Sequence, residues 1–147
     1  MPISTPPLSD ISHVIQLAIA PVFLLTAVGT LISVLTGPLG RAVDRRRILA
    51  ARIPGLDDGL AELARTEINF EEKRIRLIYF AISLAVMSAL LVCGLISLAF
   101  IDEFLVLNMG KIIAALFVLS MLALTGSLSV FLREIFLAVS SPRAPVL

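Results

Sequence analysis

Small polar side chains follow one face of the first apolar run of the sequence. On a helix that turns by about 100° per residue, the stripe spans only about 60°. Its residues are Thr26, Thr30, Ser33 and Gly37. Such a stripe has two uses: helices pack closely through small residues and hydroxyl groups, or the hydroxyl groups line a water-filled path for ions. Both uses remain open from the residues alone.

Charged residues continue the stripe on its C-terminal side, and Gln16 lies beyond it on the N-terminal side. If the stripe is a pore wall, we expect the pore to be lined by Gln16, Thr26, Thr30, Ser33 and Gly37. Its cytoplasmic mouth would then be formed by Arg41, Asp44 and Arg45. Both charge signs occur at that mouth, so the sequence does not indicate which small inorganic ions would pass. Three helices are too few to enclose a pore, so this interpretation requires a homo-oligomer.

Residues that commonly carry catalysis are scarce. His13, Cys93 and Tyr79 are each the single residue of their type, and no nucleophile, phosphate-binding or dinucleotide motif occurs. His13 and Asp10 could supply two metal ligands at most. We therefore expect neither an enzyme nor a metal site nor a cofactor. No nucleic-acid-binding motif is present, and we expect no nucleic-acid partner.

Three apolar runs predict the elements that carry these residues. They cover about 14–36, 77–101 and 112–132, and each reaches the roughly 20 residues needed to cross a bilayer. The chain has 147 residues, of which 59% are hydrophobic and 16% charged. Within lipid, backbone groups must be satisfied inside each segment, so the runs should be helices. We predict an all-α membrane protein with three transmembrane helices and one domain, residues 1–147.

The segment 38–76, between the first two runs, predicts a helical hairpin. Pro and Gly within 53–59 mark a break, and no breaker separates Glu72 from the second run. Glu67, Glu71 and Arg74 are spaced to form ion pairs along one helix. The mixed charge favours a solvated hairpin with internal and intersubunit ion pairs. The alternative function is a non-conducting assembly or adaptor protein whose hairpin binds a partner or anionic lipid.

Lys and Arg residues predict the orientation. Nine lie between Arg41 and Arg76, whereas only Lys111 borders the connection between the second and third runs. The positive-inside rule places the hairpin and the C-terminus in the cytoplasm and the N-terminus outside. In the third run, Ser120, Ala123 and Ser127 share a face and are predicted to pack against another helix.

Three stretches carry a resemblance to a known family. They are IQLAIAPVFLLTAVGTLISVLTGPLGRAVDRRR from Ile15, EEKRIRLIYFAISL from Glu71 and FLREIFLA from Phe131. Together they resemble an uncharacterised family of small bacterial three-span membrane proteins, the domain-of-unknown-function family 2721. The resemblance implies this architecture and a location in the bacterial inner membrane. It also implies that the family motif includes Gln16, Pro21, Thr36, Gly37, Arg41, Asp44 and Arg45.

The charge asymmetry generates a prediction about topology. In a Cys93→Ser background, Gly59→Cys should resist an impermeant thiol reagent applied to intact cells, because the hairpin faces the cytoplasm. Leu105→Cys should react, because the opposite connection faces outside. Labelling of Gly59→Cys with protection of Leu105→Cys would reverse the orientation.

Overall fold

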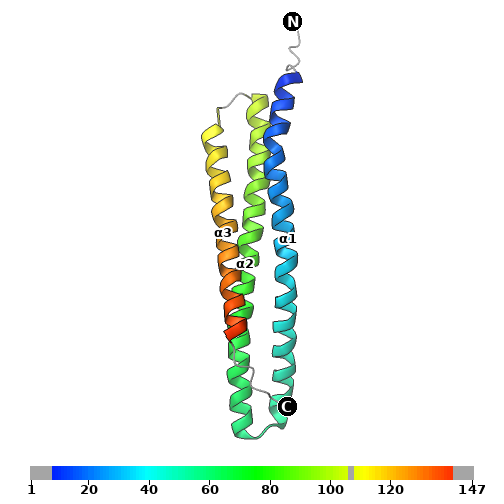
Figure 1. The fold of residues 1–147 in the computed structure, drawn as a ribbon, viewed down its shortest axis with the longest axis vertical. Coiled ribbons are helices and arrows are strands. Elements are labelled where there is room, and N and C mark those ends of the chain that lie inside the picture. Colours follow the sequence, from blue (N-terminus) through cyan, green and yellow to red (C-terminus); the bar gives the residue numbers. More distant parts are fainter. Residues whose placement is uncertain (1–7, 106–107, 141–147) are drawn as a thin grey trace. The chain divides into compact units, whose positions relative to one another are not determined.

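The computed structural model describes residues 8–105 and 108–140, and within them every long element is a helix. Helix α1 covers Leu8–Arg52, a short 3-10 turn η1 covers Ile53–Gly55, α2 covers Asp58–Leu105 and α3 covers Gly110–Ser140 (Figure 1). Each of the three long helices is long and apolar enough to cross a membrane. The predicted all-α architecture with three candidate spans is confirmed.

The predicted break between α1 and α2 coincides with η1. Pro54 lies within this turn, and the backbone N–H of Leu56 donates to the Ile53 carbonyl at 3.2 Å. Helix α2 then begins, with the N–H of Ala61 donating to the Asp57 carbonyl at 2.8 Å. Asp58 in the first turn suits the positive end of the helix dipole. From there α2 continues without interruption to Leu105, as the absence of a breaker predicted.

The helices contribute to two compact units. Among the described residues, the first unit contains 8–31, 85–105 and 108–124. Within it, the Ser88 hydroxyl of α2 donates to the Ser120 carbonyl of α3 at 2.8 Å, and both serines are fully buried. Near the end of α2, the Asp102 carboxylate accepts the backbone N–H of Met109, the residue before α3, at 2.9 Å.

Among the described residues, the second unit contains Ile32–Leu84 and 125–140. Here the Ser127 hydroxyl of α3 donates to the Ala81 carbonyl of α2 at 2.7 Å, and both residues are fully buried. Gly126 of α3 lies beside Leu84 of α2, since a Cβ added to the glycine would stand 3.4 Å from Leu84 Cδ1. The predicted packing role of Ser120 and Ser127 is confirmed, one in each unit.

Buried residues of α1 recur every seven positions, the spacing of a coiled-coil seam. They are Pro21, Val28, Leu35, Ala42 and Leu49. In α3, Ser120, Ser127 and Glu134 repeat with the same period. A single buried position in two turns leaves most of each helix surface outside the contacts within the chain. Large exposed apolar residues such as Phe23, Leu90 and Leu122 accordingly cover the outer surfaces, as expected for helices that contact lipid.

The buried serine in the second unit generates a stability prediction. Ser127→Leu should lower the free energy of unfolding by about 1–3 kcal/mol, because the larger side chain overfills a closed contact. Ser129→Leu is the matched control: this exposed hydroxyl bonds only to the Thr125 carbonyl of its own helix, so its effect should stay within about 0.5 kcal/mol. Unfolding by SDS in mixed micelles measures both values. Equal losses would contradict the packing described here.

Candidate functional site

We call the stripe of Thr26, Thr30, Ser33 and Gly37 the polar face of α1. All four residues are exposed, and so is Gln16. At about 100° per residue, Val28 and Leu35 of the buried seam lie roughly 160–180° from Thr26, on the opposite side of the helix. Among the described residues, the polar face therefore does not serve packing within the chain. Its residues are directed toward lipid, water or another molecule.

Three threonine hydroxyl groups of α1 donate back to their own helix. Thr30 Oγ1 donates to the Thr26 carbonyl at 3.0 Å, and Thr26 Oγ1 donates to the Val22 carbonyl at 3.4 Å. Thr36 Oγ1 donates to the Ser33 carbonyl at 2.7 Å. These bonds satisfy the hydroxyl protons, while each oxygen keeps acceptor capacity for a ligand or water. The face is thus compatible with lipid and equally able to accept hydrogen bonds.

Arg41 lies at the C-terminal end of this face. Side chains on a helix tilt toward its N-terminus, and Arg41 Nη1 lies 4.0 Å from where a Cβ at position 37 would stand. The guanidinium group therefore lies beside Gly37. Asp44, also exposed, follows three residues later. The predicted mouth residues Arg41 and Asp44 thus continue the polar face, and neither has an ion-pair partner among the described residues.

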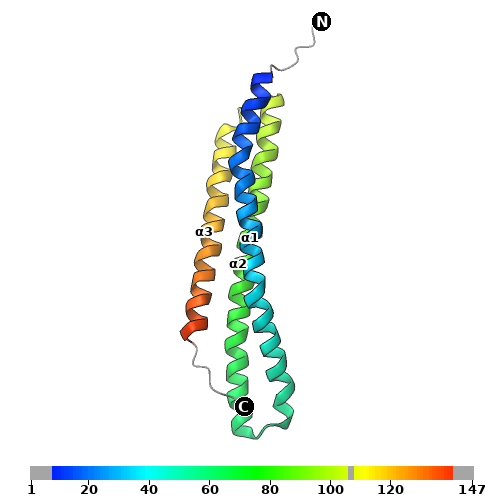
Figure 2. The ribbon, with the colours of Figure 1, turned by 45° about the vertical axis from the view of Figure 1, so that its right-hand side comes forward.

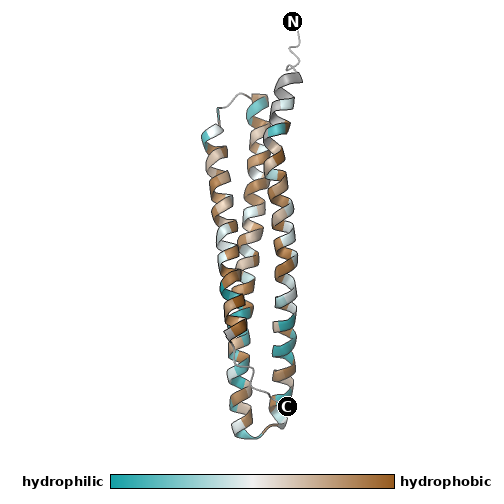
Figure 3. Cartoon of the chain, in the orientation of Figure 1, coloured by the Kyte–Doolittle hydropathy of each residue, from teal (hydrophilic) through white to brown (hydrophobic). Residues whose placement is uncertain are grey.

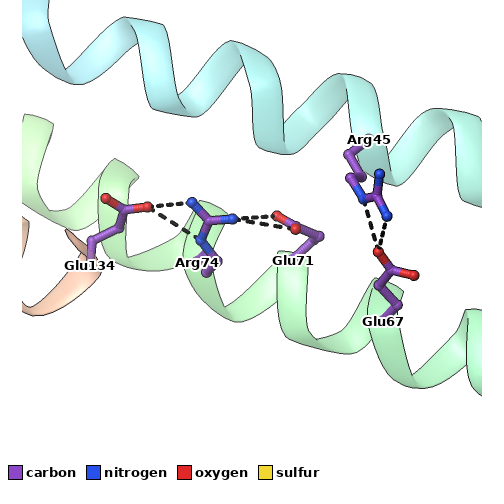
Figure 4. Close-up of polar contacts among 5 residues, drawn as sticks. All are labelled: Arg45, Glu67, Glu71, Arg74 and Glu134. Carbon is purple, nitrogen blue, oxygen red and sulfur yellow. Dashed lines mark hydrogen bonds and ion pairs between the residues drawn. The ribbon is translucent and has the colours of Figure 1, made fainter. Parts of the chain in front are cut away.

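Arg45, the third predicted mouth residue, instead contacts α2. Its Nε lies 2.8 Å from Glu67 Oε1 (Figure 4). The neighbouring Arg46 forms a second pair with Glu72 at 2.7 Å. We call residues 38–76 the hairpin, and these two pairs link its arms. Because these side chains are 25–51% exposed and water screens their charges, each pair contributes no more than about 1 kcal/mol.

A buried cluster joins α2 to α3. Arg74 Nη2 lies 2.7 Å from Glu134 Oε1, and Arg74 Nη1 lies 3.2 Å from Glu71 Oε2 (Figure 4). The side chains of Glu71 and Glu134 are 8% and 3% exposed, and that of Arg74 is 19% exposed. One guanidinium group thus serves two carboxylates. We call these three residues the charge triad.

The sequence predicted the pairing of Glu71 with Arg74 but not the part played by Glu134. A usable signal was present, because Glu134 lies seven residues after Ser127 and fourteen after Ser120. That spacing places all three on one face of α3. Glu67, predicted to pair along α2, is engaged by Arg45 instead.

The hairpin also contains a groove of about 570 Å³ between its arms, which we call the hairpin groove. Its apolar lining is Ile48, Leu49, Leu56, Leu60, Leu63 and Ala64, and its charged lining is Arg41, Asp44, Arg45 and Arg52. Across residues 8–105 and 108–140, no group of three or more His, Cys, Asp or Glu could hold a metal ion. The side chain of His13 lies outside the described residues.

The three apolar helices define the class as an α-helical membrane protein in contact with the lipid bilayer. The chain belongs to the family described as protein of unknown function (DUF2721), whose model matches residues 18–144. The resemblance found in the sequence is confirmed. Searches of the curated proteins and of the solved structures returned no match. The family range includes the polar face, the hairpin and the charge triad.

The charge triad generates a stability prediction. Arg74→Ala should cost about 3–5 kcal/mol in the free energy of unfolding, because it leaves two buried carboxylates without their cation. Arg46→Ala removes an exposed pair and should cost less than about 1 kcal/mol. SDS unfolding in mixed micelles compares the two variants. Adding Glu134→Gln to Arg74→Ala should restore part of the loss, and a further loss would contradict the assignment.

Proposed function

We propose that the protein forms a homo-oligomeric pore for small inorganic ions in the bacterial inner membrane, with the polar face of α1 toward the pore axis. One observation carries the proposal: the polar face is exposed, opposite the seam by which α1 packs within its own chain. The seam and the polar face thus use different sides of the helix. Several copies can then place their α1 helices around an axis without disturbing their internal packing.

The chemistry of the polar face supports water on this side. Gly37 has no side chain, which leaves room beside the Arg41 guanidinium at the C-terminal end of this face. Small side chains leave room for a path, and the threonine oxygens offer acceptors along it. Arg41 and Asp44 would shape the cytoplasmic mouth. Arg45 would stabilise that mouth through Glu67 rather than face the ion.

The proposed orientation follows the distribution of Lys and Arg, with the hairpin and the C-terminus in the cytoplasm and the N-terminus outside. The proposed activity is passive conduction. It involves no enzymatic step, no cofactor and no nucleic acid.

A second role is favoured by a separate observation. Large apolar side chains are exposed in the hairpin groove, outside the three apolar runs. Exposed apolar patches rimmed by polar residues are typical of interaction sites. We therefore propose as a second candidate an adaptor role, in which the hairpin recruits a partner. This role does not depend on conduction.

The pore proposal predicts the effect of Thr30→Leu in proteoliposomes. The larger apolar side chain should reduce ion flux at least tenfold, because it narrows the path and removes an acceptor oxygen. Ser83→Leu is the matched control, since Ser83 is also exposed and bonds only to the Tyr79 carbonyl of its own helix. Its flux should equal that of the unaltered protein.

Flux of a small cation and of a small anion, measured under an applied voltage, provides the readout. Size-exclusion chromatography with light scattering checks that each variant keeps its assembly. No flux of either ion from tight proteoliposomes that contain oligomers would contradict the pore. Equal flux through the Thr30→Leu variant and the unaltered protein would show that α1 does not form the wall of the pore.

A further inference from the structure

A second groove lies within the first unit, where α2 ends and α3 begins. Its volume of about 520 Å³ falls within the range of roughly 300–1,000 Å³ that is usual for pockets that bind small molecules. Most of the lining is apolar and comes from all three long helices, including Pro21 of α1, Leu95 and Ala99 of α2, and Ala114 and Phe117 of α3. We call it the connection groove.

The connection groove lies at the edge of the apolar runs. The second run ends near residue 101 and the third begins near residue 112, so Asp102 and Glu103 of the lining stand at this boundary. Figure 3 shows hydrophilic colours at the end of α2, beyond a largely apolar stretch of the helix. From Asp102 back to Leu95 the helix rises about 10 Å, most of the roughly 15 Å that one leaflet contributes to the hydrocarbon core. The groove therefore has the position and the length to hold a lipid acyl chain that runs inward from the boundary.

The boundary end of the groove carries two carboxylates. Glu103 is exposed and Asp102 is partly buried, and neither forms an ion pair within residues 8–105 and 108–140. One oxygen of Asp102 accepts the Met109 N–H at 2.9 Å, and the other, like both oxygens of Glu103, can accept from a ligand. Lys111 is exposed, does not line the groove and pairs with neither carboxylate. A cationic group that donates hydrogen bonds is therefore the complement of this end.

The first turn of α3 supplies the opposite polarity. Gly110 begins α3 and lines the groove, and the positive end of a helix dipole favours a phosphate group. A headgroup with both a phosphate and an ammonium group thus finds a partner for each charge. A second copy of the chain is a poorer occupant. Inserted in the same orientation, it brings Asp102 and Glu103 again but only Lys111 to balance them.

We propose that the connection groove binds a phospholipid whose headgroup carries a primary ammonium, as in phosphatidylethanolamine. One acyl chain lies along the apolar lining, the ammonium donates hydrogen bonds to Asp102 and Glu103, and the phosphate faces the first turn of α3. A primary ammonium has three N–H donors. The quaternary ammonium of phosphatidylcholine has none, and phosphatidylglycerol has no cation. The site depends neither on conduction nor on the hairpin.

The test measures the binding of single lipids to the full chain in detergent by native mass spectrometry. Phosphatidylethanolamine, phosphatidylcholine and phosphatidylglycerol with identical acyl chains are titrated separately. The first should bind at least about fivefold more tightly than either of the others, because only its ammonium forms charge-assisted hydrogen bonds with the carboxylates. Glu103→Gln should remove most of this preference. Glu62→Gln is the matched control and should keep it, since Glu62 is exposed but does not line the groove.

A second pair of variants locates the acyl chain. Ala114→Leu should weaken binding of phosphatidylethanolamine about tenfold, because the larger side chain occupies the groove. Ala115→Leu should leave binding unchanged, because Ala115 is exposed on the same helix but does not line the groove. Circular dichroism checks that all four variants keep their helix content, and the mass of the lipid-free protein checks their assembly.

Three results would overturn the proposal. If phosphatidylethanolamine binds no more tightly than either of the other lipids, the proposed headgroup is wrong. Equal effects of Ala114→Leu and Ala115→Leu would show that the lipid binds elsewhere. If Ala114→Leu lowers the number of copies in the assembly and Ala115→Leu does not, a second copy of the chain occupies the groove.

Discussion

The narrow seam of α1 is the constraint on which the rest of the structure depends. One residue in seven, including Val28, Leu35 and Ala42, is buried against the other helices. Such a seam requires only a thin strip of the helix, so the opposite side is free to carry Thr26 and Thr30 on an exposed face. The pore proposal follows from this division, because contacts within the chain and contacts around an axis then use different sides of one helix.

Polar groups within the chain also form two sets, one buried between helices and one exposed. In the second unit, where α2 and α3 run alongside each other (Figure 2), buried polar groups join the two helices. The Ser127 hydroxyl of α3 donates to the Ala81 carbonyl of α2, and the Arg74 guanidinium of α2 contacts Glu134 of α3 (Figure 4). Exposed pairs such as Arg45 with Glu67 link the arms of the hairpin at modest energetic value. Arg41 and Asp44 have no ion-pair partner among the described residues. Both side chains are exposed.

The sequence predicted the elements well and the contacts between them poorly. The three apolar runs and the break around Pro54 are local signals, because run length and backbone conformation depend on neighbouring residues. The seam cannot be recognised from hydropathy, since a helix in lipid is apolar on its buried side and on its outer side alike. Arg74 and Glu134 are separated by 60 positions, so only the fold brings them together. For the polar face, the sequence predicted which residues share a side, and the structure added that this side is exposed.

Accessibility of α1 to water tests the central claim most directly. In a Cys93→Ser background, Thr26, Thr30 and Ser33 are replaced one at a time by cysteine, and Leu122→Cys and Leu128→Cys provide exposed positions on α3. The rate of reaction with a small charged methanethiosulfonate is then measured in native membranes. The account predicts fast modification at the three α1 positions and slow modification at the two α3 positions. Equally slow modification at all five would show that the polar face meets lipid or protein rather than water.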